Sequence, residues 1–166
     1  RCLMESDEEL VKRTLAGGNH HYGVLIQRYA DYLFGLGMRL TAGNRELAED
    51  ISQQSFLKSY TYLKSFDARK TYKHWLTGIA VNCFKDIRLK EQRYAPIDDT
   101  NEASYSPRLE ENSDFFNLIQ PLDDNEKIMF TLKYVYDYRT QEIADVLDLK
   151  TGTVKSKISR ALEKLK

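Results

Sequence analysis

Residues 140–166 carry the sequence TQEIADVLDLKTGTVKSKISRALEKLK, which predicts two short helices joined by a tight turn. Thr140 and Thr151 are each placed to cap a helix, because a threonine hydroxyl accepts hydrogen bonds from the free N–H groups of a first turn. The two helices are expected at 140–147 and 151–165, with three residues between them. This order is typical of a helix-turn-helix motif.

The second helix of this segment is expected to have one apolar face and one basic face. Its apolar residues recur at spacings of three and four, so they form a single stripe on a helix with 3.6 residues per turn. Residues 150–166 also hold six basic residues and one acidic residue. The expected buried stripe consists of Val154, Ile158, Ala161, Leu162 and Leu165.

The basic face suits the major groove of DNA, because long cationic side chains reach phosphates and guanine edges. A basic face alone is also expected of a solvated helix in a three-helix bundle. The arrangement of two capped helices around a three-residue turn favours DNA. The residues predicted to contact DNA are Thr151, Thr153, Lys155, Ser156, Ser159 and Arg160.

The net charge of the whole chain first argues against a nucleic-acid partner. Its 166 residues include 25 basic and 25 acidic side chains, so the formal net charge is zero, which is unusual for a protein that binds nucleic acid. The charges are unevenly spread, however: residues 1–94 sum to +4, residues 95–126 to −8 and residues 127–166 to +4. Two basic blocks are separated by an acidic one. The neutral total therefore does not exclude a protein that binds nucleic acid.

The acidic block also divides the chain. All three prolines lie between residues 95 and 126. Proline interrupts helices, and like charges keep a segment extended and solvated. We therefore predict a flexible acidic linker over 95–114 between a domain at 5–94 and a second domain at 115–166.

Both blocks are predicted to be helical, so the predicted fold class is all-α, with two small helical domains. Apolar residues recur at helical spacing, and no sustained alternation indicates a strand. Ser6 and Glu9 form the pattern of a capping box at the start of a helix that ends before Gly17. Further helices are expected over 20–40, 45–64 and 71–92 in the first block, and over 113–119 and 124–136 in the second.

Nothing in the sequence indicates a catalytic centre, a metal site or a cofactor. The two cysteines and three histidines are not spaced as ligand sets, and no glycine-rich phosphate loop or nucleophile motif occurs. No apolar run approaches the roughly 20 residues that cross a bilayer, and the first residues lack the apolar stretch of a signal peptide. We therefore expect a non-enzymatic, metal-free protein of the cytoplasm, without membrane insertion.

The residues at 140–166 resemble the fourth-region helix-turn-helix of bacterial sigma factors, through EIA at 142–144, GTVKSK at 152–157 and RA at 160–161. Two earlier stretches resemble the second region: AEDISQQSFLKSYTYLKSF at 48–66 and YKHWLTGIAVNCFKDIRLKEQR at 72–93. Both motif sets in one short chain are typical of the extracytoplasmic-function (ECF) sigma factors, which lack the domain between these regions. The resemblance implies a protein that binds core RNA polymerase, recognises a promoter, melts its DNA and starts transcription.

The resemblance assigns the loop 66–71 and the following helix to the minus-ten element of the promoter. Strand opening requires cations for the phosphates and a pocket or platform for an unstacked base. Asn82 matches the asparagine of the family's I-A-x-N motif and is expected to read a base edge. Trp75 and Cys83 lie on the apolar arc and are expected in the core. The residues predicted for this role are Phe66, Arg69, Lys70, Tyr72, Lys73, Asn82 and Lys85.

The helix at 45–64 carries an apolar residue within a polar face, which suggests a surface that binds a partner. This face consists of Asp50, Gln53, Gln54 and Leu57, and Tyr60 is expected on the buried side. A single exposed leucine is also common on solvated faces, so periodicity leaves both interpretations open. In the family this stretch binds the coiled coil of the polymerase β′ subunit, although Gln54 stands where an acidic residue is frequent.

The resemblance implies two further partners: the β flap of polymerase for the fourth region, and an anti-sigma factor. Two alternatives remain in other functional classes. One is a stand-alone helix-turn-helix regulator that needs no polymerase, and the other is a helical adaptor that binds only proteins. Neither accounts for both motif sets.

Overall fold

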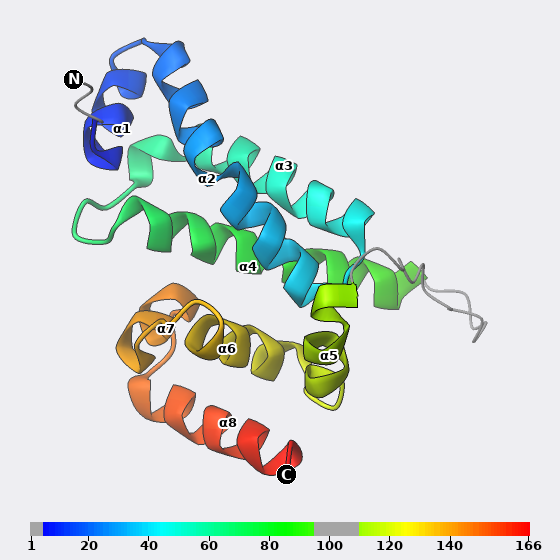
Figure 1. Ribbon diagram of the computed structural model, residues 1–166. Helices are drawn as coiled ribbons and strands as arrows, with labels where there is room; N and C mark the ends of the chain where they lie inside the picture. The colour runs from blue at the N-terminus through cyan, green and yellow to red at the C-terminus, as the bar shows by residue number, and fades with distance from the viewer. Residues whose placement is uncertain (1–4, 95–109) are drawn as a thin grey trace.

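A computed structural model describes residues 5–94 and 110–166, and over these ranges the chain is helical without a strand (Figure 1). The predicted all-α class is confirmed. The N-terminal lobe (5–94) contains α1 (Asp7–Leu15), α2 (Asn19–Leu40), α3 (Arg45–Thr61), the 3-10 turn η1 (Leu63–Ser65) and α4 (Tyr72–Tyr94). The C-terminal lobe (110–166) contains α5 (Glu110–Ile119), α6 (Asp124–Tyr134), α7 (Thr140–Leu147) and α8 (Thr151–Lys164).

Polar side chains mark several helix starts. The Ser6 hydroxyl accepts a hydrogen bond from the N–H of Glu9 at 3.1 Å, as the sequence predicts. The predicted caps Thr140 and Thr151 are wrong, because both residues already lie in the first turn of their helices. At α7 the Glu142 carboxylate instead accepts from the N–H of Arg139, the residue in the cap position, at 2.7 Å.

One apolar core joins the two lobes. It begins in α1 at Leu10, includes buried residues of α2, α3 and α4, and continues through α6 and α7 to Ile158 of α8. In Figure 1, α6 and α7 lie between α4 and α8, and the packing of α7 against both α4 and α8 agrees with this order. Helix α4 therefore has helices of both lobes packed against it.

The predicted linker falls mostly on residues outside the described ranges. Of 95–114, only 110–114 are described, and they belong to α5. The boundaries 5–94, 95–114 and 115–166 therefore stay predictions.

The crossing of α2 and α3 depends on a close approach at Gly37. A methyl group at this position would lie 3.0 Å from the Cα and 3.2 Å from the Cβ of Ala48, which is itself fully buried. Gly23 lies in the same helix, but a methyl group there would meet nothing within 4 Å. The two glycines therefore form a matched pair of probes for the packing of α2.

We expect Gly37→Ala to destabilise the fold by about 1–2 kcal/mol, because overpacking at an unyielding backbone outweighs the better helix propensity of alanine. Gly23→Ala should stabilise it by about 0.5–1 kcal/mol, since only the propensity changes. Urea unfolding followed by circular dichroism measures both effects. Shifts of both unfolding midpoints to higher urea would contradict the close approach at Gly37.

Candidate nucleic-acid interface

The C-terminal lobe contains a helix-turn-helix built from α7, a tight turn and α8. Asp148 ends α7 in the left-handed region (φ 56°), and the N–H of Leu149 donates to the carbonyl oxygen of Ala144 at 2.9 Å. Aspartate adopts this conformation more readily than most residues, because its short polar side chain bonds locally. The predicted three-residue turn is confirmed. The buried side chains of α8 are Val154, Ile158 and Ala161.

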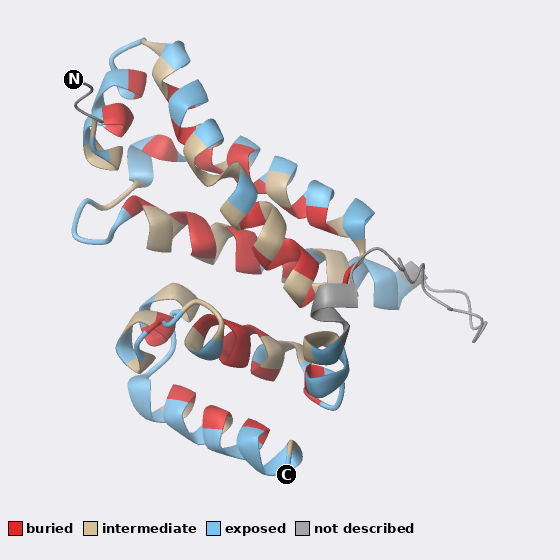
Figure 2. Ribbon diagram, in the orientation of Figure 1, coloured by how far each residue is buried: buried red, intermediate tan, exposed pale blue. Residues whose placement is uncertain are grey.

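The outer face of α8 is open to solvent, as Figure 2 shows by the exposed colour along that side. No ion pair among the described residues engages Lys155 or Arg160. Leu162 was predicted to be buried, which is wrong: it is 40% exposed, because it lies next to Ala161 at the edge of the apolar stripe. Of the predicted DNA contacts, Thr153 is half-buried, and the exposed ones are Thr151, Lys155, Ser156, Ser159 and Arg160.

Lys164 belongs to the same helix but has a structural role. Its Nζ lies 2.7 Å from Oε1 of Glu126, whose side chain is only 7% exposed. Burial acts to raise the pKa of Glu126, but the hydrogen bonds from Lys164 and from the N–H of Asp123 outweigh it and hold that pKa below its usual value. The basic residues of α8 therefore divide into those that face solvent and one that ties α8 to α6.

In the loop before α4, Arg69 and Asp67 are joined by hydrogen bonds. Asp67 accepts hydrogen bonds from the backbone N–H of Arg69 at 3.0 Å and from its Nε at 2.9 Å. The Arg69 side chain remains 90% exposed. The predicted role of Tyr72 as an aromatic surface for DNA is corrected, because its ring is fully buried and its hydroxyl lies 2.8 Å from Ser59 Oγ. Phe66 is half-buried and packs edge-on against it.

A pocket of about 240 Å³ opens beside this loop, between the end of α3 and the middle of α4. The exposed Asn82 lies in its lining, as does Tyr62, which is 60% exposed. Trp75 was predicted in the core, but it is half-buried and forms part of the wall. Aromatic rings, an amide and an ammonium group are the groups that hold an unstacked base. The lining residues are Lys58, Tyr62, Ser65, Trp75, Ile79 and Asn82.

Of the six lining residues, the sequence pointed only to Asn82; Lys58, Tyr62, Ser65 and Ile79 were missed. Lys58 lies in α3, Tyr62 directly after it and Ser65 in η1, so only the packing of this segment against α4 brings them to Asn82. One signal was present, since Tyr62 is an aromatic residue in a polar, charged stretch of sequence. Cys83, predicted in the core, is fully buried, and burial raises the pKa of its thiol.

The polar face of α3 is exposed as predicted. Asp50, Gln53, Gln54 and Leu57 are all exposed, and Leu57 keeps 66% of its surface accessible. Tyr60 was expected on the buried side but is 44% exposed, because its ring packs on the outer side of Tyr22. Leu57 and Tyr60 together give this face an apolar area.

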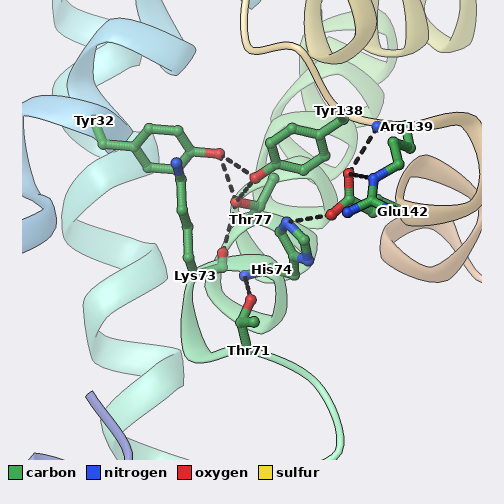
Figure 3. Close-up of polar contacts among 8 residues, drawn as sticks. All are labelled: Tyr32, Thr71, Lys73, His74, Thr77, Tyr138, Arg139 and Glu142. Atoms are coloured by element: carbon green, nitrogen blue, oxygen red, sulfur yellow. Dashed lines mark hydrogen bonds and ion pairs between the residues drawn. The ribbon is translucent and has the colours of Figure 1, made fainter. Parts of the chain in front are cut away.

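A polar cluster lies where α2 and α4 meet the segment before α7 and the start of α7, as drawn in Figure 3. The hydroxyl of Tyr32 lies 2.7 Å from those of Thr77 and Tyr138, and the latter two are 3.1 Å apart. Beside them, His74 Nε2 lies 3.7 Å from Oε2 of Glu142. Lys73 Nζ lies 4.8 Å from the centre of the Tyr32 ring, a cation–π contact.

Burial is the largest cause of the pKa shifts in this cluster. It raises the pKa of Tyr32 and of Tyr138 above the usual value, so both hydroxyls stay protonated and available for hydrogen bonding. Burial also lowers the pKa of His74 from 6.5, although the Glu142 carboxylate acts in the opposite direction. At neutral pH His74 is therefore mainly neutral, and its contact with Glu142 is not a full ion pair.

Within residues 5–94 and 110–166, no three His, Cys, Asp or Glu side chains gather where they could hold a metal ion. Over the same ranges, no helix is both long and apolar enough to cross a membrane.

Two family models match the chain, and each covers one of its lobes. Residues 25–94 match the model described as Sigma-70 region 2, which includes most of α2 and all of α3 and α4. Residues 114–165 match Sigma-70, region 4, which includes the helix-turn-helix. The pocket beside Asn82 and the exposed face of α8 thus lie in different matched regions.

Two characterised relatives match along nearly the whole chain. The ECF RNA polymerase sigma-E factor of Haemophilus influenzae is 28% identical, over 95% of this chain and 92% of its own length. The ECF RNA polymerase sigma factor SigW of Bacillus subtilis is 29% identical, over 94% of this chain and 92% of its own length.

Solved structures share the fold. CnrH in complex with the cytosolic domain of CnrY aligns with a TM-score of 0.73 and 22% identity, over 97% of this chain and 95% of that one. The sigma factor RpoE of Bartonella quintana, in complex with the anti-sigma factor NepR, aligns with a TM-score of 0.63 and 21% identity. It covers 84% of this chain and 92% of that one.

Proposed function

The chain belongs to the ECF sigma factors, and from this premise we propose which of its surfaces bind polymerase and which bind the promoter. As a sigma factor it directs core RNA polymerase to promoters and starts transcription. Its role is that of a non-enzymatic specificity subunit, and it acts in the bacterial cytoplasm, where polymerase and DNA are found.

The exposed basic face of α8 is the observation that supports this function most strongly. Lys155 and Arg160 point away from the lobe that α8 packs on, and the small Ser156 and Ser159 lie between them. This face enters the major groove of the minus-thirty-five element, where the two cations contact phosphates or guanine edges and the serines allow close approach. Lys164 does not take part, because it pairs with Glu126.

The pocket beside Asn82 receives an unpaired base of the minus-ten element. Tyr62 offers an exposed ring for stacking, and the Asn82 amide pairs with a base edge. Arg69 and Lys70, in the loop before α4, attract the phosphates of the opened strand. Lys73 lies over the Tyr32 ring, on the other side of α4 from Trp75, Ile79 and Asn82, so it does not line the pocket. Phe66 and the buried Tyr72 hold the loop from beneath, and Lys85 lies further along α4.

The exposed face of α3 binds core polymerase. An apolar centre with a polar surround is typical of a protein interface, and Leu57 with Tyr60 provides that centre among Asp50, Gln53 and Gln54. We assign it to the β′ coiled coil and the C-terminal lobe to the β flap. An anti-sigma factor is a further expected partner, since RpoE of Bartonella quintana was solved with one.

A stand-alone regulator would need no polymerase, and an adaptor would need no DNA. The matches to both sigma-70 regions argue against both alternatives. The exposed face of α3 provides region 2 with a surface for polymerase, and the exposed face of α8 provides region 4 with a surface for DNA.

We expect Leu57→Asp to reduce binding of the chain to core RNA polymerase by roughly tenfold or more, as for a central interface residue. Leu89→Asp is the matched control, because Leu89 is 59% exposed on α4, outside the proposed interface. A pull-down of core enzyme at several concentrations measures both. Equal binding by the two variants would overturn the assignment of this face, and no binding by the unaltered chain would overturn the function.

We expect Tyr62→Ala to reduce formation of the open promoter complex by roughly 5- to 150-fold, the value of one base–aromatic stacking contact. Tyr62→Phe keeps the ring and should keep most of the activity. Permanganate footprinting of unpaired thymines, with saturating core polymerase, reads strand opening directly. If Tyr62→Ala opens the promoter as well as Tyr62→Phe, the ring has no part in base capture.

A further inference from the structure

Helix α1 lies outside both family matches, which begin at residues 25 and 114. It packs against α2 and also against the turn η1, and Figure 1 shows it beside that turn. Leu63 of η1 is buried in one apolar cluster with Leu10 and Val11 of α1, while Ser65 of the same turn lines the pocket. Helix α1 therefore supports a wall of the pocket from the side of the core.

Asp7, in the first turn of α1, makes two polar contacts with α2. Its Oδ1 accepts a hydrogen bond from Arg28 Nη1 at 2.7 Å, and its Oδ2 accepts one from the Tyr29 hydroxyl. The side chains of Asp7 and Arg28 keep only 18% and 22% of their surface exposed. Charge-assisted hydrogen bonds are stronger than neutral ones, so this contact fixes Tyr29 more firmly than an exposed ion pair would. Burial and the hydrogen bond to Asp7 raise the pKa of Tyr29, and its hydroxyl therefore stays protonated as the donor.

Aromatic contacts lead from Tyr29 to the pocket. The centre of its ring lies 5.7 Å from that of Tyr72, which is fully buried. The Tyr72 ring lies 5.9 Å from Phe66 and 5.8 Å from Trp75, and Trp75 forms part of the pocket wall. Protein interiors are close-packed, so a displaced ring moves its neighbours. We call these four rings the aromatic layer: Tyr29, Phe66, Tyr72 and Trp75.

We propose that Asp7 is a positioning residue for base capture, which holds Tyr29 in the aromatic layer and so keeps the pocket beside Asn82 shaped for an unstacked base. The inference rests on the proposed function, because it takes base capture in this pocket from it. Asp7 does not line the pocket itself, and its effect passes through Tyr29 and Tyr72. Helix α1 thereby takes part in reading the minus-ten element.

A purely structural role for Asp7 would have a different effect on DNA binding. Loss of its contacts would then lower the amount of folded chain, and every DNA strand would be bound less well by the same factor. A positioning role instead changes how strongly the folded chain prefers a strand that carries the captured base. This preference is a ratio of two Kd values, so it does not depend on the fraction of folded chain.

Binding of single-stranded minus-ten DNA to the holoenzyme tests the positioning role. The holoenzyme is assembled from core polymerase and the full chain, and the strand comes from a promoter that it transcribes. Each nucleotide of the strand is replaced in turn by an abasic one, which keeps the phosphate and removes the base. The unaltered chain should lose roughly 5- to 150-fold in affinity at the captured position, as for one base–aromatic contact.

Three variants are then compared at the captured position. Asp7→Ala removes both polar contacts, and Tyr29→Phe removes only the hydroxyl and keeps the ring. Glu8→Ala is the matched control, because Glu8 is an acidic residue of the same helical turn and engages no ion pair among the described residues. We expect Asp7→Ala and Tyr29→Phe each to reduce the abasic loss by at least about twofold, the lower limit for coupled groups, and Glu8→Ala to leave it unchanged.

An abasic loss that stays the same in Asp7→Ala and Tyr29→Phe would overturn the positioning role, even if both variants bind all strands more weakly. An equal change in Glu8→Ala would overturn it as well. Tyr29→Phe preserves the ring and decides the outcome should Asp7→Ala not fold. If no abasic position weakens binding by the unaltered chain, the base pocket of the proposed function is wrong, and this result is distinct from a failure of Asp7 alone.

Discussion

Burial of α4 on two sides is the constraint on which the rest of the structure depends. Helices α2 and α3 pack against it in the N-terminal lobe and α7 packs against it from the C-terminal lobe, so little of its middle remains for a ligand. What remains is the strip around Asn82, where the pocket lies. The same packing places Lys70 and Lys73 at the boundary between the lobes. Fold, base pocket and interlobe contact are thus consequences of one helix with three neighbours.

Local sequence predicted the helices well, because their ends are marked locally. Ser6 caps α1, and the turn at Asp148 separates α7 from α8 as expected. Errors arose where a residue far along the chain decides the outcome. Tyr72 lies at the start of a basic helix, yet Ser59 and the surrounding core bury its ring. Trp75 lies on the apolar arc of its helix, yet it is half-buried in the wall of the pocket that the end of α3 forms with α4.

In the candidate site, surfaces made by a single helix were predictable from the sequence, and the pocket made by several elements was not. Faces made by one helix, such as Lys155 to Arg160 or Asp50 to Leu57, follow from periodicity and are exposed as expected. The pocket combines the end of α3, η1 and α4, so spacing within one helix shows only Asn82 and not Tyr62. The contact of Tyr32 with Tyr138 joins residues 106 positions apart, and no local pattern indicates it.

The central claim is that the chain directs core polymerase to promoters through the exposed basic face of α8. Run-off transcription with core polymerase measures this directly, with Arg160→Ala compared with the unaltered chain. Lys12→Ala is the control, because Lys12 is exposed on α1 and belongs to no proposed interface. We predict that Arg160→Ala strongly reduces the transcript and that Lys12→Ala leaves it unchanged. Equal amounts of transcript from all three chains would contradict the account.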